Sequence, residues 1–275
     1  MINSKEIEIR SLYSVKELEE VRKLESKIWG ENDSIPSHQT LTAVKNGGLV
    51  LGAFYRDELI GFQYSFPGFN GKSIYLCSHI LGIDEEFRKK GIGEKLKAVQ
   101  RQEAIKLGYS LITWTYDPLE SVNAYLNMAK LGGTCSTYME NCYGEMDDLL
   151  NSGIPSDRFL VEWNLLQEEP IKFHKEVEIE HLVEESIIQY EMNKEGFPIP
   201  ISILSQNQVK NEDVYVAIPK DFQGMKNADL QIAKEWRKVT RDVFQSLFEE
   251  GFQVIDFRKN TISEIPVQFY ILNKK

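Results

Sequence analysis

The spacing of hydrophobic residues in the first half of the chain alternates between the periods of helices and strands. Apolar residues at helical spacing predict a helix over 15–29, with Ser14 as its N-cap and Glu17 completing a capping box. A second, short helix is predicted over 39–45, before a glycine pair that would end it. Alternating and continuous apolar runs predict four strands, at 7–12, 49–55, 59–66 and 73–83.

The last of these strands leads through a glycine-containing turn into a long amphipathic helix over 91–107, with Gly108 as its C-cap. The elements predicted beyond it are a strand at 111–116, a helix at 121–131, and strands at 135–142 and 159–165. The predicted order over the first 166 residues is therefore β-α-α-β-β-β-α-β-α-β-β, an α/β arrangement around a mixed sheet.

The remaining sequence predicts a further β-α-β-β segment without a glycine-rich phosphate loop. Its predicted elements are a strand at 214–218, a helix at 228–250, and strands at 252–257 and 267–272. Such a segment is either a small second domain or an extension of the same sheet. We expect a first domain over 1–167 and a C-terminal α/β extension over 168–275.

Composition narrows the class of protein. Hydrophobic residues make up 42% of the 275 residues and aromatic residues 11%, as in a globular core. The formal net charge of -10 disfavours a nucleic-acid partner, whose phosphates would be repelled. The chain has no apolar run of transmembrane length and no leader-like stretch, so we expect no membrane partner.

The cysteines and histidines of the chain do not form a metal-binding or disulfide pattern. Three cysteines are an odd number without metal-ligand spacing, and the four histidines form no HxH or HExxH cluster. These features predict a soluble, cytoplasmic protein without a structural metal.

The most informative segment runs from Leu81 to Leu96, where a strand, a basic turn and a helix N-terminus follow one another. Backbone N–H groups at a helix N-terminus attract phosphate, and glycine lets an oxyanion approach them closely. Arg88, Lys89 and Lys90 fit a phosphate role, whereas Lys97 and Arg101 are expected on a solvated helix face.

The spacing excludes two common phosphate loops. Gly91-Ile92-Gly93-Glu94-Lys95 lacks the GxxxxGK[ST] pattern of a Walker loop, and Leu96 occupies the last glycine position of a dinucleotide fingerprint. The pattern Arg88-x-x-Gly91-x-Gly93 instead resembles the R/Q-x-x-G-x-G/A signature of the GNAT (Gcn5-related) N-acyltransferases. Upstream residues also match that family's usual sequence, namely Leu81, Ile83 and Phe87, with Glu85 where proline is common.

This resemblance covers about residues 6–166 and implies acetyl-CoA or another acyl-CoA as co-substrate. It implies a sheet that opens between the strands at 73–83 and 111–116, with the pantetheine arm in the opening. Backbone groups of the turn would hold the pyrophosphate, and the end of the preceding strand would face pantetheine and the acyl carbonyl. The implied coenzyme A-binding residues are Leu81, Gly82, Ile83, Arg88, Lys89, Lys90, Gly91, Ile92, Gly93 and Asn123.

His79 is the candidate general base. Strand alternation predicts one shared face for Cys77, His79, Leu81 and Ile83. Many enzymes of the family carry the base or its water chain on that face, and arylalkylamine-type members resemble this chain in having a histidine there. A packed strand histidine is the structural alternative.

The acid that protonates the departing thiolate is less clear from the sequence. The family often has a tyrosine on the next helix, but Met128 stands at that position here. Tyr125 lies one helical turn earlier and is the candidate acid, with a packing role as the alternative.

Two further residues have alternative interpretations. Asn123 either bonds pantetheine amides or caps its helix. Arg158 either binds a substrate carboxylate bidentately or forms a surface ion pair with Asp157 or Glu162.

The sequence therefore predicts an acyl-CoA-dependent N-acyltransferase, most simply an N-acetyltransferase, acting on a primary amine of a small metabolite such as an amino acid. The alternatives are an N-succinyltransferase of amino acids and a non-catalytic acyl-CoA-binding or regulatory protein. A homodimer formed through the C-terminal segment is also possible.

Overall fold

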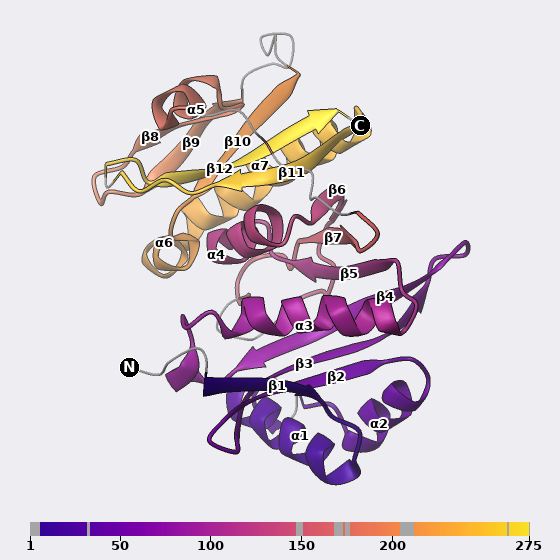
Figure 1. Ribbon diagram of the computed structural model, residues 1–275. Helices are drawn as coiled ribbons and strands as arrows, with labels where there is room; N and C mark the ends of the chain where they lie inside the picture. Colours follow the sequence, from indigo (N-terminus) through magenta and orange to yellow (C-terminus); the bar gives the residue numbers. More distant parts are fainter. Residues whose placement is uncertain are drawn as a thin grey trace. The chain divides into compact units, whose positions relative to one another are not determined.

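The computed structural model of the protein describes residues 6–31, 34–146, 151–167, 173, 177–203, 212–262 and 264–274 (Figure 1). Internal packing divides the chain into two compact units. Unit 1 comprises Met1–Trp114 and Trp163–Glu168, and unit 2 comprises Thr115–Glu162 and Glu169–Lys275. The chain passes from one unit to the other inside two strands. The boundary expected at residues 167 and 168 stays a prediction.

Unit 1 is a sheet covered by helices on both faces. Its strands run in the order β1 (Ile7–Ser11), β2 (Leu49–Tyr55), β3 (Glu58–Phe69), β4 (Ile74–Ile83) and β5 (Leu111–Tyr116, of which Leu111–Trp114 lie in this unit). The first four strands pair antiparallel, and β4 pairs parallel with β5. Its helices are α1 (Val15–Trp29), α2 (Ser37–Lys45), the 3-10 turn η3 (Glu85–Phe87) and α3 (Ile92–Lys106).

Consecutive residues of β3 contribute to opposite faces of the sheet in unit 1. Phe62 and Tyr64 pack with the apolar side of α1, including Leu18 and Val21. Gln63 lies between them in sequence and bonds to side chains on the α3 face. Helices α1 and α2 therefore cover one face, and α3 covers the other (Figure 1).

Local sequence signals explain the element ends in unit 1. Helix α1 has the predicted bounds because the Ser14 hydroxyl accepts the Glu17 N–H at 3.3 Å while the Glu17 carboxylate accepts the Ser14 N–H at 3.0 Å. Strands β2 and β3 are joined by Arg56 and Asp57, whose φ values of 49° and 65° form the turn expected of a two-residue hairpin.

Unit 2 is built on an antiparallel sheet in the order β7-β6-β11-β12-β10. The sheet strands are β6 (Thr134–Met139), β7 (Arg158–Asn164), β10 (Asp213–Pro219), β11 (Phe252–Arg258) and β12 (Val267–Lys274). A separate ribbon pairs β8 (Ile188–Met192) with β9 (Pro198–Ile203). The helices are α4 (Ser121–Ala124), the π-helical segment η4 (Tyr125–Lys130), α5 (Ile179–Glu185), α6 (Phe222–Ala228) and α7 (Leu230–Glu249).

The core of unit 2 forms between α7 and the sheet. The Phe244 ring of α7 lies 4.7 Å from the Phe159 ring of β7 and 5.4 Å from the Tyr270 ring of β12, both edge to face. Trp236 is fully buried on the same helix, and its indole N–H donates to the Pro198 carbonyl at 2.7 Å.

The predicted element order from β1 to β7 is confirmed, but the C-terminal segment is richer than predicted. The helix predicted over 228–250 is confirmed as α7, which begins at Leu230 because Asp229 is extended and its carboxylate caps Gln231 and Ile232, whereas α6 before it was not predicted. Helix α5 and the β8–β9 ribbon were not predicted. Among the described residues, no helix is long and apolar enough to cross a membrane.

Candidate functional site

The loop between β4 and α3 carries the glycine signature on the surface of unit 1. Gly91 is the N-cap of α3 with a left-handed φ of 77°, and Arg88, Lys89 and Lys90 before it are exposed. The first turn of a helix leaves N–H groups without partners inside the helix, and the helix dipole is positive there. The loop thus combines backbone donors with three cations, which suits a bound phosphate or pyrophosphate.

Side-chain hydrogen bonds within unit 1 fix the conformation of this loop. The Asp84 carboxylate accepts the Glu86 N–H at 3.3 Å and the Lys27 ammonium at 2.6 Å, and the Lys27 bond keeps the pKa of Asp84 below its ordinary value. The Arg88 Nε donates to the Ile83 carbonyl at 3.2 Å, so its stem follows the loop. These contacts leave the loop preorganised.

The two glycines of the signature meet different requirements. Gly91 is required by its backbone, because a positive φ strains any residue with a Cβ. Gly93 has no positive φ, and a Cβ built there would meet only Ile83 Cδ1 at 3.5 Å and Leu81 Cδ2 at 3.8 Å, which is ordinary contact. Packing of the described residues therefore does not require glycine at position 93.

Strands β4 and β5 pair over a short stretch only. Their register joins Leu76 with Ile112 and Cys77 with Thr113, and Ser78–Ile83 continue without pairing to β5. We call the place where this pairing stops the divergence point. An opening between these strands was predicted, and the register agrees with it.

The predicted shared face of β4 is wrong at His79. The β3–β4 register pairs Tyr64 with Ile80 and Ser65 with Ser78, which leaves His79 as the extra residue of a β-bulge. The alternation therefore changes at this point. His79 contacts the rings of Tyr64 and Phe66, whereas Leu81 and Ile83 lie on the α3 side near Gly93.

The environment of His79 suits a neutral imidazole. His79 is an exposed residue, and the centres of the adjacent Tyr64 and Phe66 rings lie 6.0 Å and 5.5 Å from the centre of its ring. The partial burial of the ring lowers the pKa of His79 below its ordinary value. A histidine that is uncharged at neutral pH can accept a proton. The role of His79 as the general base stays a prediction.

Lys97 does not lie on a solvated helix face, so that expectation is wrong. Its side chain is 4% exposed, and its ammonium donates to the Ser78 hydroxyl at 2.8 Å. The signal that sequence reasoning missed is helical spacing, because position 97 follows the buried Leu96 on the inner side of α3. Arg101 is half-buried and donates to the Leu165 carbonyl at 3.0 Å.

In unit 2, Asn123 and Tyr125 are on the helical segment after β5. Asn123 is exposed and lies inside α4, whose N-cap is Glu120, so the capping interpretation of Asn123 is wrong. Tyr125 is half-buried at the start of η4, with the Lys259 ammonium 4.0 Å from its ring centre. Met128 is fully buried. The binding role of Asn123 and the acid role of Tyr125 stay predictions.

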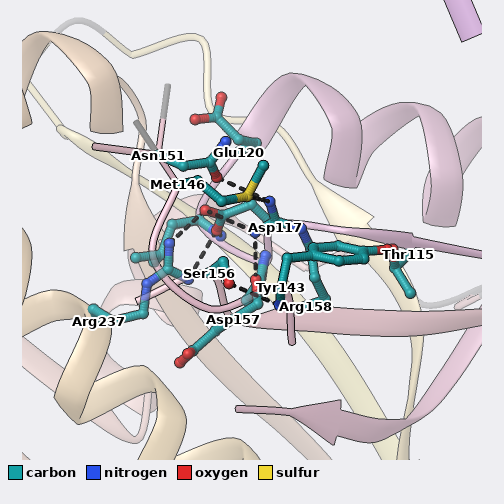
Figure 2. Close-up of polar contacts among 12 residues, drawn as sticks. Thr115, Asp117, Glu120, Tyr143, Met146, Asn151, Ser156, Asp157, Arg158 and Arg237 are labelled. Carbon is teal, nitrogen blue, oxygen red and sulfur yellow. Dashed lines mark hydrogen bonds and ion pairs between the residues drawn. The ribbon is translucent and has the colours of Figure 1, made fainter. Parts of the chain in front are cut away.

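Arg158 is buried rather than on the surface, so the surface ion pair is wrong. Its guanidinium donates to the Asp157 carbonyl at 2.8 Å and to Asn151 Oδ1 at 2.9 Å, and lies 3.9 Å from Asp117 Oδ2 (Figure 2). Binding of a substrate carboxylate by Arg158 stays a prediction.

A buried ion pair in unit 2 was not predicted. Arg237 of α7 donates through both terminal nitrogens to the Asp117 carboxylate, which also accepts the Leu119 N–H at 2.8 Å (Figure 2). Burial works against the charge of Arg237, but Asp117 outweighs it and raises the pKa of the guanidinium. The two residues stand 120 positions apart, so no local pattern indicates the pairing.

The other ionisable groups of the described part of the chain form no metal site. Within that part, no three His, Cys, Asp or Glu side chains are grouped so that they could hold a metal ion. Cys77, Cys135 and Cys142 are not joined in disulfides.

No protein-family model and no curated protein matches this chain. Solved acetyltransferase structures are similar to it over somewhat more than half its length. The ribosomal-protein-S18-alanine N-acetyltransferase from Escherichia coli is 13% identical, over 61% of this chain and 99% of that chain, with a TM-score of 0.48. YncA of Salmonella typhimurium, a putative acetyltransferase solved with its cofactor acetyl-CoA, is 15% identical over 60% and 98%, with a TM-score of 0.48. An N-acetyltransferase from Staphylococcus aureus Mu50 is 16% identical over 58% and 98%, with a TM-score of 0.47.

Proposed function

We propose that the chain is a GNAT-type N-acyltransferase that transfers an acyl group, most simply acetyl, from coenzyme A to a primary amine of a small metabolite such as an amino acid. The observation that carries the proposal is the β4–α3 loop, where the Arg88-x-x-Gly91-x-Gly93 pattern, three exposed cations and a helix N-terminus coincide. The end of the β4–β5 pairing after Cys77 and Thr113 supports it further.

The residues present fit a bound acyl-CoA at its phosphate end. Backbone N–H groups of Ile92 and Gly93 would hold the pyrophosphate, and Arg88 to Lys90 would neutralise its charge. Gly93 supports this assignment, because its missing Cβ serves no packing need of the fold and leaves room for a close approach. Leu81 to Ile83 would line the pantetheine arm through their backbone.

In the proposed reaction the amine attacks the thioester carbonyl directly. A new N–C bond forms, the C–S bond breaks, and the proton lost by nitrogen must reach a base. His79 is the proposed base, because it lies at the bulge just beyond the divergence point and its lowered pKa keeps it neutral at physiological pH. Arg158 is proposed to bind a carboxylate of the acceptor, and the three cysteines outside any disulfide fit the proposed cytoplasmic location.

A non-catalytic acyl-CoA-binding or regulatory protein is the second candidate. The observation that favours it is Met128, fully buried at the position where the family often carries its acid. Loss of that acid removes assistance for the departing thiolate, although a thiol with a pKa of about 8.5 can leave unaided.

The test is thiol release from acetyl-CoA and from succinyl-CoA across amino acids of both configurations and simple amines. We expect release that depends on the acceptor amine, and the better donor identifies the acyl group. No release with any acceptor, while coenzyme A still raises the melting temperature, would favour the binding protein. Sedimentation at micromolar concentration tests the possible homodimer separately.

A further inference from the structure

A cluster of polar side chains is buried inside unit 1, between the sheet and α3. It consists of Gln63 and Ser65 of β3, Ser78 of β4, and Lys97 and Gln100 of α3, and each is at most 6% exposed. Burial of an amine is costly unless a partner compensates, so such a cluster calls for an explanation. No carboxylate of the described residues pairs with Lys97, which leaves the hydroxyl of Ser78 as its hydrogen-bond partner.

The amine of Lys97 lies at the divergence point of β4 and β5. The last pair joined by the two strands is Cys77 with Thr113, and the next residues are Ser78 on β4 and Trp114 on β5. Lys97 Nζ is 2.8 Å from Ser78 Oγ and 3.6 Å from the centre of the Trp114 ring, so it touches both. It therefore sits where the acyl-sulfur end of a coenzyme inserted between these strands would arrive.

The hydrogen bonds around Ser78 run in one direction. Its hydroxyl oxygen accepts from Lys97 Nζ at 2.8 Å and from Gln63 Nε2 at 3.2 Å. A serine oxygen has two lone pairs, and both are used, so the hydroxyl proton is left to be donated. No hydrogen bond donated by this hydroxyl is found among the described residues, and the amide oxygens of Gln63 and Gln100 in the same cluster have no partner there either.

The Lys97 amine is partly protonated near neutral pH. Burial lowers the pKa of Lys97 to about 7, against a small opposing effect of the Cys77 thiol of β4. Gln63 of β3, which bonds to Ser78, and Trp114 of β5, which contacts Lys97, are both uncharged, and the Trp114 ring face favours the ammonium. An acid of this strength delivers its proton readily to a thiolate whose conjugate thiol has a pKa of about 8.5.

We propose that Lys97, acting through the hydroxyl of Ser78, supplies the proton that the departing coenzyme A thiolate takes up. This inference rests on the proposed function and fills the role left open by Met128. As the C–S bond breaks, sulfur takes the Ser78 hydroxyl proton and Ser78 takes one from the Lys97 ammonium. The proton lost by the amine passes to solvent. Lys97 then regains a proton from solvent. Amine and thioester thus yield amide and thiol in balance.

Ser78 and His79 then divide the proton transfers between the two faces of β4. Ser78 faces α3 and Lys97, whereas His79 contacts the aromatic rings on the α1 side. Successive residues of a strand point to opposite faces, so Ser78 and His79 can serve an acid and a base at one point of β4.

The first experiment compares Lys97→Met, Ser78→Ala and a matched control, Ser65→Ala, by the pH dependence of kcat. Ser65 belongs to the same buried cluster but contacts Gln63 and Gln100 rather than Lys97. We expect kcat to fall on the order of 100-fold in the first two variants, the low end for general acid catalysis because thiolate is a good leaving group. The alkaline loss of wild-type activity, where Lys97 deprotonates, should vanish in both and persist in Ser65→Ala.

The second experiment needs no turnover. Coenzyme A itself is bound to each protein, and its thiol is titrated by the ultraviolet absorbance of the thiolate. An ammonium nearby lowers the pKa of the bound thiol, so we expect a lower value in wild type than in Lys97→Met. Equal values in the two proteins, or an unchanged alkaline limb of kcat in both Lys97→Met and Ser78→Ala, would overturn the inference while leaving the acyltransferase intact. Failure of coenzyme A to bind any of the proteins would overturn both.

Discussion

The amine of Lys97 lies 3.6 Å from the centre of the Trp114 ring, inside unit 1 and without a carboxylate partner among the described residues. Its pKa is lowered from 10.5 to about 7 because burial disfavours the charged form. Between these two values the unfolded chain holds a proton that the folded chain has released. Stability therefore rises with pH across this window, by up to about 1.4 kcal/mol per pH unit.

We expect Lys97→Met to remove this slope. At pH 7 and below, the variant should be more stable than wild type by about 2–4 kcal/mol, because it no longer buries a charge, and the difference should shrink as pH rises toward 10.5. Urea unfolding of both proteins at several pH values measures it. Two stability curves that run parallel across the window would contradict the buried, titrating amine.

The two glycines of the β4–α3 loop should separate stability from coenzyme binding. Gly93→Ala adds a Cβ where the fold has room, so stability should hold or rise slightly while coenzyme A affinity falls at least about tenfold. Gly91→Ala places a Cβ at a φ of 77° and should cost about 1–2 kcal/mol of stability. Thermal unfolding and calorimetric titration of both variants give the two readouts. Wild-type coenzyme A affinity in Gly93→Ala would refute the pyrophosphate assignment.

Local patterns predicted much of unit 1. The bounds of α1 follow from a cap at Ser14 and from apolar spacing, and the phosphate-type loop follows from its glycines and cations. These signals lie within a few residues of the structure they determine. The bulge at His79 could not be predicted in this way, because it depends on the register in which β4 pairs with β3. The alternation of residues along β4 does not indicate that register.

Long-range partners explain the other differences. A lysine on an amphipathic helix normally indicates the solvated face, and only the fold shows that Lys97 meets Ser78, 19 residues away in sequence. Strand β9 contains Pro198 and Pro200, which argue against a central strand, yet a two-stranded ribbon tolerates them because it has free edges. The Asp117–Arg237 pair has no local signal at all.

Replacing His79 tests the proposed base. His79→Ala should lower turnover on the order of 100-fold without weakening coenzyme A binding, because the side chain lies at the bulge and away from the loop. The acidic loss of wild-type activity should lie below pH 6.5, since burial lowers the pKa of His79 and the imidazole must be neutral to accept a proton. Steady-state kinetics of the wild type and the variant across pH measure the loss of turnover. Titration with coenzyme A is the control for binding. Unchanged turnover would remove His79 from the mechanism.

The Asp117–Arg237 pair should be a main source of stability in unit 2. Removing one member of a buried pair costs about 3–5 kcal/mol, because the other charge is left without compensation. The loss should not be symmetrical. After Arg237→Met, Arg158 lies 3.9 Å from Asp117 and still compensates part of its charge, whereas Asp117→Asn leaves two buried arginines without that carboxylate.

We therefore expect Asp117→Asn to destabilise the protein more than Arg237→Met in urea unfolding, with the double variant less destabilised than the sum of the two. The reference is Lys106→Met, which breaks an exposed pair with Glu103 and should change stability by at most about 1 kcal/mol. Equal losses in the two single variants would mean that Arg158 contributes nothing at Asp117.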